Sequence, residues 1–276
     1  MSTTKKVKVV DSTFSHNPAI GFAGERVGET PQAFRWDTSP GDAPVKVFTD
    51  IRLKEALDDP CPKKIALLLE CPAVNPGMYS WILEHKDVFH TVLTHQEELV
   101  YRGKPFKFYP FGGSWIGEWG IFPKSKMVSM LVSEKRLTHG HRLRHEAAKM
   151  DLIDAYGSGV GRHVKSKAEA LRDYRFAVII ENDDSNWWFT EKLVDCCSQG
   201  TIPLYRGCPK IGEFFHLGGF IRWQELDELA AILRSLRPED YDNRMIAVYE
   251  NLKRARKYQC AEDWIVDHYG DLLWAT

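Results

Sequence analysis

The strongest chemical signal in the sequence follows an apolar run, Phe176–Ile180, that has the length and composition of a buried strand. The strand ends in Glu181-Asn182, and after a polar and aromatic loop a helix is predicted to begin at Thr190-Glu191-Lys192. Threonine is a favoured N-cap, and the free N–H groups of a helix start, together with a lysine, attract anions. Glu191 could accept hydrogen bonds from sugar or ribose hydroxyls. The spacing favours a diphosphate site; the alternative is an ordinary capped helix with a solvated lysine.

Two further stretches have residue types that suit sugar or phosphate binding. The Gly-rich, aromatic loop 111–117 contains Trp115, and an aromatic face in such a loop suits a sugar on the acceptor side, an interdomain hinge being the alternative. The stretch Lys124–Lys149 is rich in basic residues, which suits a phosphate or nucleotide, a nucleic-acid acceptor or a solvated helix face. His141 and His145 in it share a helix face, so zinc is a further reading, which the flanking arginines oppose.

The elements that must position these residues alternate along the chain. The first predicted series has strands at Val7–Val10, Ile65–Leu69, Val88–Leu93 and Phe106–Phe111, and the second at Met127–Val132, Ile153–Tyr156, Phe176–Ile180, Ile202–Tyr205 and Phe220–Trp223. Helices are predicted at 76–84, 94–100, 140–150, 167–172 and 190–198, and over the last fifty residues. Uninterrupted apolar strands separated by helices are typical of parallel sheets covered on both faces.

The arrangement of the two series predicts an α/β chain of two Rossmann-like domains that face a cleft. A junction rich in glycine, proline and aromatic residues separates them, so the predicted domains are residues 1–125 and 126–276, the second closed by helices. Ligands of such sheets bind beyond the carboxyl ends of the strands. We therefore expect the functional residues directly after the strands.

Composition excludes several classes of protein. The net charge of the 276 residues is −1, so no global field attracts nucleic acid or acidic lipid. We find neither a signal peptide nor an apolar run of membrane-spanning length, and the spacing of the six cysteines suits neither zinc nor a disulfide framework. We expect a soluble chain with reduced thiols in the cytoplasm of a bacterium or of a virus-infected cell. The adjacent pair Asp183-Asp184 lacks the Asp-x-Asp spacing of a metal site, and no metal or cofactor is expected.

The order of these motifs is similar to that of glycosyltransferase family 10, the α-1,3-fucosyltransferases. In that family, a strand that ends in Glu-Asn is followed by a loop, Thr-Glu-Lys and Gly-Thr-Ile-Pro, and this series occurs here between Tyr174 and Pro203. Leu69–Pro72, Tyr109–Gly112 and Val132–Glu134 resemble other elements of the family, in the right order, although Glu134 stands where the family has asparagine. The resemblance covers residues 64–223, and the chain looks like a short bacterial or viral relative.

The resemblance implies a GT-B fold, a nucleotide-sugar donor with GDP-fucose as the default, and inversion at the anomeric carbon without a metal ion. It implies that Glu70 is the general base for the acceptor hydroxyl, the alternative being a structural ion pair with a nearby lysine. Lys192 and one arginine, Arg144 or Arg142, would neutralise the leaving pyrophosphate. The other expected donor-binding residues are Ser133, Tyr174, Asn182, Thr190 and Glu191, and the expected acceptor-binding residues are Glu70 and Trp115.

Three other functions are weighed against this one. The same fold could glycosylate a modified base in DNA through the basic stretch 124–149, in which case binding would fall steeply with salt. A catalytically inactive nucleotide-sugar-binding protein would bind a donor without turnover. A Rossmann-type oxidoreductase is disfavoured because no G-x-G-x-x-G follows the early strands.

Overall fold

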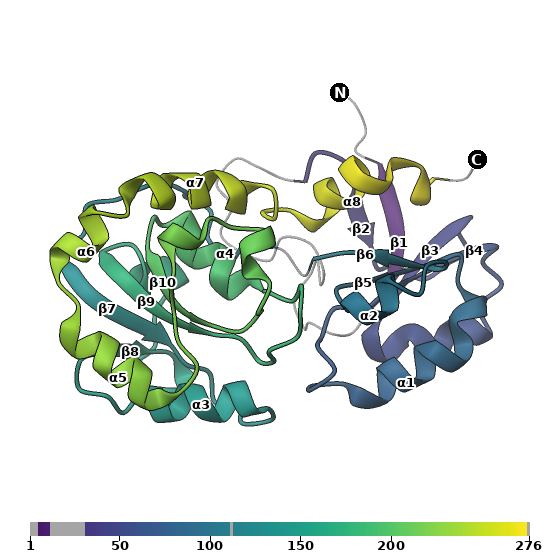
Figure 1. The fold of residues 1–276 in the computed structure, drawn as a ribbon. Helices are drawn as coiled ribbons and strands as arrows, with labels where there is room; N and C mark the ends of the chain where they lie inside the picture. The colour runs from purple at the N-terminus through teal and green to yellow at the C-terminus, as the bar shows by residue number, and fades with distance from the viewer. Residues whose placement is uncertain (1–4, 12–30, 111–112, 275–276) are drawn as a thin grey trace.

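The chain folds around two sheets of parallel strands, which Figure 1 shows side by side. The structure, a computed structural model, describes residues 5–11, 31–110 and 113–274. The first sheet has the order β2-β1-β3-β4-β5-β6, and its strands are β1 (Lys6–Val10), β2 (Arg35–Asp37), β3 (Val45–Thr49), β4 (Lys63–Leu67), β5 (Thr91–Thr94) and β6 (Phe106–Phe108). The second has the order β11-β10-β9-β7-β8, and its strands are β7 (Lys126–Leu131), β8 (Asp154–Tyr156), β9 (Tyr174–Ile180), β10 (Ile202–Arg206) and β11 (Ile221–Arg222).

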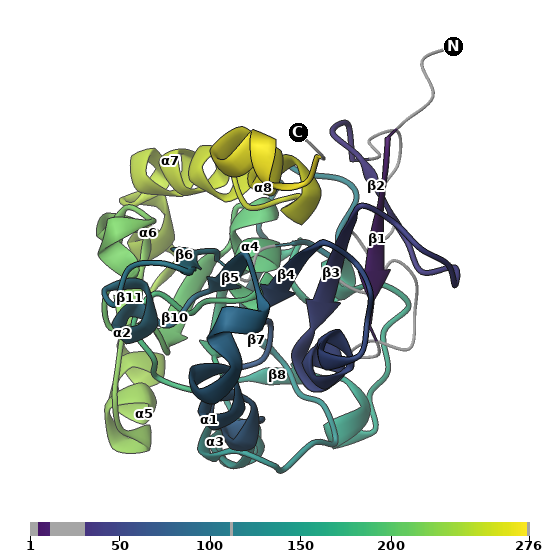
Figure 2. The same cartoon turned by 90° about the vertical axis from the view of Figure 1, so that its right-hand side faces the viewer.

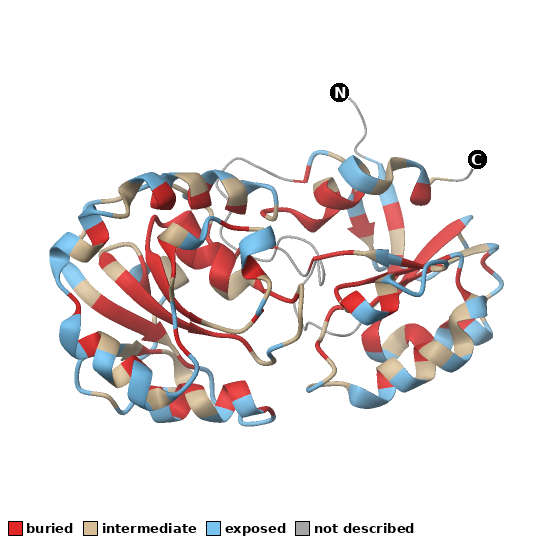
Figure 3. Cartoon of the chain, viewed as in Figure 1, coloured by how far each residue is buried: buried red, intermediate tan, exposed pale blue. Residues whose placement is uncertain are grey.

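Helices cover both faces of each sheet. They are α1 (Pro76–His85), α2 (Glu97–Val100), α3 (His139–Ala147), α4 (Glu191–Ser198), α5 (Leu226–Ser235), α6 (Pro238–Asp242), α7 (Met245–Arg256) and α8 (Ala261–Tyr269). Figures 1 and 2 show α8 and α1 on opposite faces of the first sheet. In the second half, α4 packs on one face of the sheet and α3 and α5 on the other, and α7 contributes residues to both cores. Figure 3 shows the buried strands in the middle of each half, which explains their uninterrupted apolar runs.

The predicted α/β class with parallel sheets is confirmed, because every described strand pairing is parallel. Two strands were missed, β2 and β3. β2 has only three residues, and β3 contains Lys46, whose charge disguises a fully buried strand. The ammonium of Lys46 pairs with Asp59 at 2.7 Å, which makes its burial tolerable.

Element boundaries differ from the prediction at several ends. The predicted strand 88–93 begins only at Thr91, because residues 86–88 form a 3-10 turn, and the predicted helix 94–100 begins at Glu97. The helix predicted over 140–150 ends at Ala147. The end of the predicted strand 106–111 and the first two residues of the loop 111–117 lie outside the described residues.

The end of the chain returns to the first half. Ala261, Trp264 and Ile265 of α8 belong to the same core as Val7 of β1 and Leu67 of β4. The predicted second domain, residues 126–276, includes α8, whereas this helix packs on the first sheet. The boundary at 125/126 stays a prediction. None of the helices in the described part of the chain is long and apolar enough to cross a membrane. All six cysteines are buried as free thiols.

Candidate active site

A cavity of about 480 Å³ lies where the carboxyl ends of the two sheets face each other. Its walls come from the loops after β4, β7, β8 and β9, from the start of α4, and from the segment 113–115 that connects the two halves. Its volume is typical of a site for a small organic ligand. The carboxyl ends of parallel strands therefore form the site, as the sequence predicts.

Most of the predicted site residues line this one cavity. They are Glu70, Trp115, Ser133, Arg144, Asn182, Thr190, Glu191 and Lys192. Arg142 does not line the cavity; it is exposed, whereas Arg144 is buried. The two residues are two positions apart in a helix, and side chains at that spacing point to nearly opposite sides. Tyr174 does not line the cavity either. It lies at the amino end of β9, six residues before Ile180, and its hydroxyl is 2.7 Å from Asp154 and 2.6 Å from that of Tyr156.

Glu181 connects the end of β9 to the start of α4. Its fully buried carboxylate accepts hydrogen bonds from the backbone N–H and the hydroxyl of Thr190, at 2.9 and 2.8 Å. The hydroxyl oxygen of Thr190 in turn accepts from the backbone N–H of Lys192, which confirms the predicted N-cap. The Glu of the Glu-Asn pair therefore holds the helix start in place, while Asn182 is left to face the cavity.

The start of α4 is rich in charge. The ammonium of Lys192 lies 3.6 Å from Glu181 and 3.6 Å from Glu191. Burial raises the pKa of Glu191, but the ammonium groups of Lys192 and Lys167 outweigh it and hold the pKa at about 2. Glu191 is therefore ionised at neutral pH and can only accept hydrogen bonds. Ligand hydroxyls are the groups that such a carboxylate recognises.

Arg144 is a buried cation between α3 and the end of β9. Its guanidinium donates to the carbonyl oxygen of Ile180 at 2.5 Å and to the side-chain oxygen of Asn182 at 2.6 Å. Gly140 allows the helix to approach this closely, because a Cβ there would lie 1.9 Å from the carbonyl oxygen of Glu181. Arg144 thereby fixes the amide of Asn182, so that its nitrogen is the end left for a ligand.

Glu70 faces the cavity from the first half, three residues after β4. Its backbone is held on both sides, because its N–H lies 3.3 Å from the carboxylate of Asp50 and the hydroxyl of Tyr79 donates to its carbonyl oxygen at 2.6 Å. Asp50 has a left-handed backbone, with φ +37°, a strained conformation that often marks functional sites. Burial raises the pKa of the Glu70 carboxyl, and the positive charge of Lys192 partly offsets this. A carboxylate with a raised pKa is suited to accept a proton.

The structure gives other partners to the residues considered for metal binding. The ring of His141 contacts the hydroxyl of Thr138, the ring of His145 contacts the carbonyl oxygen of Lys135, and Asp184 pairs with Arg206 at 2.9 Å. Burial and the neighbouring cations lower the pKa of His141 to about 4, so it is neutral at neutral pH. Within the described ranges, no group of three or more His, Cys, Asp or Glu residues could hold a metal ion.

Sequence reasoning missed two charged residues of the cavity wall, Lys167 and Asp195. Asp195 follows Glu191 by four positions and so lies on the same face of α4, which is a signal that could have found it. Lys167 is separated from both by more than twenty residues and gave no local signal. Trp115 lines the cavity next to them, and its backbone N–H donates to Asp195 at 2.8 Å.

Comparison with known proteins places this site in a family. The model described as glycosyltransferase family 10 (fucosyltransferase), C-terminal part, matches residues 121–269, just over half of the chain. The alpha-(1,3)-fucosyltransferase FucT of Helicobacter pylori is 36% identical over 62 residues, which is 22% of this chain and 13% of that protein. This match therefore spans a small part of the relative's length.

Solved structures agree over nearly the whole chain. A crystal structure of an alpha1,3-fucosyltransferase with GDP aligns with a TM-score of 0.60 at 14% identity, over 99% of this chain and 91% of that one. Another, with GDP-fucose, aligns with a TM-score of 0.55 at 14% identity, over 100% and 93%. At this identity the likeness shows the fold, and the expected GT-B arrangement is confirmed. The family expected from the motifs is confirmed by the family model.

Proposed function

Because the chain belongs to glycosyltransferase family 10, the fucosyltransferases, we propose that it transfers a sugar from a nucleotide diphosphate donor to an acceptor hydroxyl. Fucose from GDP-fucose is the default donor. The observation that carries the proposal is that one cavity holds a carboxylate with a raised pKa, Glu70, and a lysine, Lys192, at the positively polarised start of α4. This is the pairing of base and anion site that such a transfer needs.

The second half supplies the donor site in this proposal. When the bond between sugar and pyrophosphate breaks, negative charge develops on the phosphate oxygens. Lys192, Arg144 and the positive end of the α4 dipole are preorganised to stabilise that charge. The stabilisation needs no metal ion in our proposal. Ionised Glu191 and the amide of Asn182 then bind hydroxyl and carbonyl groups of the nucleotide or sugar, and Ser133 lies at the exposed rim.

The first half supplies the base and the acceptor side. Glu70 takes the proton of the acceptor hydroxyl as its oxygen attacks the anomeric carbon from the side opposite the pyrophosphate. A single base on that side gives inversion in one step, without a covalent intermediate. We assign the acceptor to residues 1–125 and the donor to the part of the chain after 126. Trp115, in the connecting segment, lies where both substrates would meet.

The donor half of the proposal is tested by nucleotide binding. We expect GDP to raise the melting temperature of the chain in the presence of EDTA, and UDP, CDP and ADP to raise it less. A ligand at about 100 times its Kd adds about 2.7 kcal/mol to the stability of the folded chain, which moves the melting temperature by several degrees. The measurement is thermal unfolding with each nucleotide, in EDTA and in Mn²⁺.

Each result has a distinct meaning. A shift with UDP alone would keep the glycosyltransferase and replace the donor, and a shift that requires Mn²⁺ would contradict the metal-independent mechanism. No shift with any nucleotide would contradict the donor site. The transfer itself is tested by release of GDP from GDP-fucose when glycan acceptors are added. Binding without release under these conditions would favour the catalytically inactive alternative.

Exposed basic residues of α3 and of the loop before it offer a separate test of the acceptor. Lys135, Arg136 and Arg142 are exposed on α3 and the loop before it, and Lys135 lines the cavity. This is the surface that the alternative with a modified DNA base would use. Binding to duplex DNA that falls steeply between about 50 and 200 mM salt would favour DNA over a glycan as the acceptor.

A further inference from the structure

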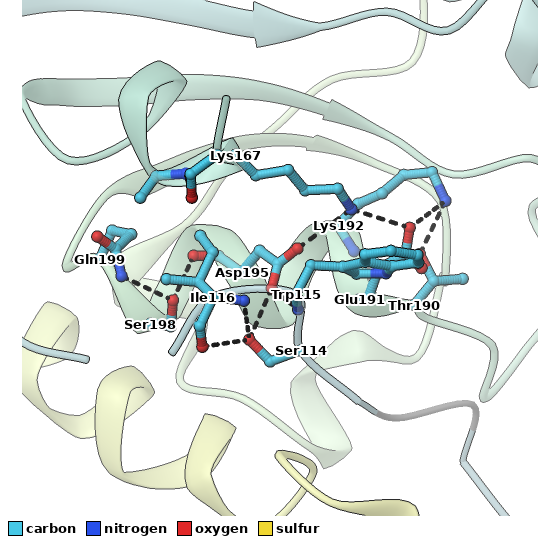
Figure 4. Close-up of polar contacts among 12 residues, drawn as sticks. Ser114, Trp115, Ile116, Lys167, Thr190, Glu191, Lys192, Asp195, Ser198 and Gln199 are labelled. Carbon is cyan, nitrogen blue, oxygen red and sulfur yellow. Dashed lines mark hydrogen bonds and ion pairs between the residues drawn. The ribbon is translucent and has the colours of Figure 1, made fainter. Parts of the chain in front are cut away.

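Three carboxylates and two lysines form a connected group at one wall of the cavity. Lys167 begins a 3-10 turn, Lys167–Ala170, and its ammonium lies 3.2 Å from Asp195 and 3.4 Å from Glu191. Figure 4 shows the end of Lys167 between these two carboxylates. The same oxygen of Glu191, Oε1, lies 3.6 Å from the ammonium of Lys192, so the two lysines share it.

The ammonium of Lys192 lies among negatively charged side chains, of which Glu191 is one. It also pairs with the buried Glu181, so the group contains three carboxylates and two ammonium groups. Without Lys167, Lys192 would be the one ion-pair partner of Glu191 among the described residues, with Arg144 as a more distant cation, and Lys192 would have to balance more of the group. An ammonium that is paired with carboxylates is a poorer partner for a pyrophosphate, because the negative charges of the carboxylates repel the negatively charged ligand. Lys167 therefore has a direct electrostatic effect on how available Lys192 is.

Asp195 extends the group to the segment that connects the two halves. Only 1% of its side chain is exposed, and both of its oxygens are used. One accepts from the hydroxyl of Ser114 at 2.7 Å and the backbone N–H of Trp115 at 2.8 Å, and the other pairs with Lys167. The ammonium of Lys167 also lies 5.0 Å from the centre of the Trp115 ring, a cation–π contact. A buried carboxylate of this kind needs its cation.

We propose that Lys167 is a positioning residue of the donor site. It pairs with Glu191 and Asp195, and so leaves the ammonium of Lys192 available to the diphosphate of the donor, while it keeps Trp115 against α4. The inference rests on the donor site proposed above. It predicts that the loss of Lys167 weakens the binding of the charged phosphates of the ligand and leaves the binding of its base and ribose unchanged.

The test compares the binding of GDP and of guanosine by calorimetry. We expect Lys167→Met to weaken GDP binding about tenfold and to change guanosine binding by less than about twofold, since guanosine has no phosphate. Lys8→Met is the matched control. Lys8 is a partly buried lysine of β1 that pairs with Asp37 at 3.0 Å and does not line the cavity, so its loss should leave both affinities unchanged.

A double variant separates positioning from direct contact. In Lys167→Met/Asp195→Asn, the amide oxygen can still accept from Ser114 and Trp115, while one uncompensated carboxylate is removed. We expect the double variant to regain at least about threefold in GDP affinity over the single variant. A lysine that bound the phosphates itself would not be replaced in this way, so a double variant as weak as the single one would overturn the inference.

The remaining outcomes are also decisive. Equal losses for GDP and guanosine in Lys167→Met would show a merely structural role and overturn the inference, and so would an unchanged GDP affinity. In both cases wild-type GDP binding would leave the proposed function intact. A wild-type chain that does not bind GDP would overturn the proposed donor and this inference with it.

Discussion

The two cavity glutamates, Glu70 and Glu191, have opposite pKa shifts, and each shift has a clear physical cause. Burial raises the pKa of Glu70, with Lys192 acting against it, whereas two lysines hold the pKa of Glu191 at about 2 in spite of its burial. Two environments that shift the pKa values of two carboxyl groups in opposite directions leave one group able to accept a proton and the other always charged. We therefore assign catalysis to Glu70 and ligand binding to Glu191.

The first prediction concerns Glu70 itself. Glu70→Gln should lower the rate of sugar transfer by about 10²- to 10⁴-fold, because the attacking hydroxyl then has no base. The affinity for GDP should not fall, since the donor site lies in the other half and the change removes a negative charge near Lys192. Transfer rates and calorimetric GDP binding check the two expectations. Glu84→Gln, at an exposed glutamate of α1 in the same half, is the control. Near-normal transfer by Glu70→Gln would disprove the assignment of the base.

The pH dependence of the same reaction follows from the direction of the shift. Only ionised Glu70 can accept the proton, so transfer falls as the pH falls through its pKa. Since burial raises that pKa above the ordinary value of 4.5, the acid limb of kcat/KM should lie above pH 4.5. The limb should vanish in the residual activity of Glu70→Gln. An identical limb in that variant would assign it to another group.

At the scale of elements, the close contact between α3 and the end of β9 builds half of the donor site. Arg144 reaches Asn182 because Gly140, one turn earlier in α3, lets the helix touch the backbone of Glu181. Glu181 then holds the N-cap Thr190 of α4. One strand end thus aligns two helices, and a shift of either helix would move a cation.

The second prediction tests this contact. Gly140→Ala should destabilise the fold by about 1–3 kcal/mol, because the added methyl group overlaps backbone that cannot easily move. It should also weaken GDP binding, because α3 must move and carry Arg144 away from the cavity. Urea unfolding and calorimetry measure the two effects.

A second glycine of the same chain is the control. Gly77 lies in α1, and a Cβ there would meet nothing within 4 Å. Gly77→Ala should therefore leave stability unchanged or raise it by up to about 1 kcal/mol, since alanine is the better helix former. A Gly140→Ala variant that behaves like Gly77→Ala would contradict the proposed contact.

At the scale of the whole molecule, the two halves are joined in more than one place. Glu97 of α2 is bonded to Lys210 and, at 2.9 Å, to Asn186, both from the second half. The last helix, α8, completes the core of the first sheet after the chain has passed through the second. The first half is therefore built from two separate pieces of the chain, one before and one after the second half, so we expect the stabilities of the two halves to be coupled.

The third prediction tests the contribution of α8 to the core of the first sheet, at Trp264. The ring is 6% exposed, stacks on His268 and contacts Phe108 and Tyr109 edge-on. Trp264→Ala should cost about 3–5 kcal/mol, because it empties a large buried site under the first sheet. Ile246→Ala, at a residue of α7 that is 84% exposed, should change stability by less than about 0.5 kcal/mol. Equal effects of the two in urea unfolding would show that α8 does not complete the core.

Local sequence was sufficient for much of the protein. The apolar runs predicted most of the strands, the Thr-Glu-Lys triplet predicted the capped helix start, and the position of Glu70 and Asn182 after strands predicted where they would face. These features depend on neighbouring residues, because strand and helix periodicity and N-capping act over a few positions. The same local motifs carry the resemblance to the family.

Only the tertiary structure decided how distant segments meet. It brought Arg144 and not Arg142 to the cavity, turned Tyr174 towards Asp154, and joined Ser114, Lys167 and Asp195 into one group. The burial of Lys46 in a strand, where it pairs with Asp59, and the packing of α8 on the first sheet are also visible only in the tertiary structure. Each of these depends on contacts between residues far apart in the sequence, whose energies arise only once the two sheets are packed, and no local pattern records them.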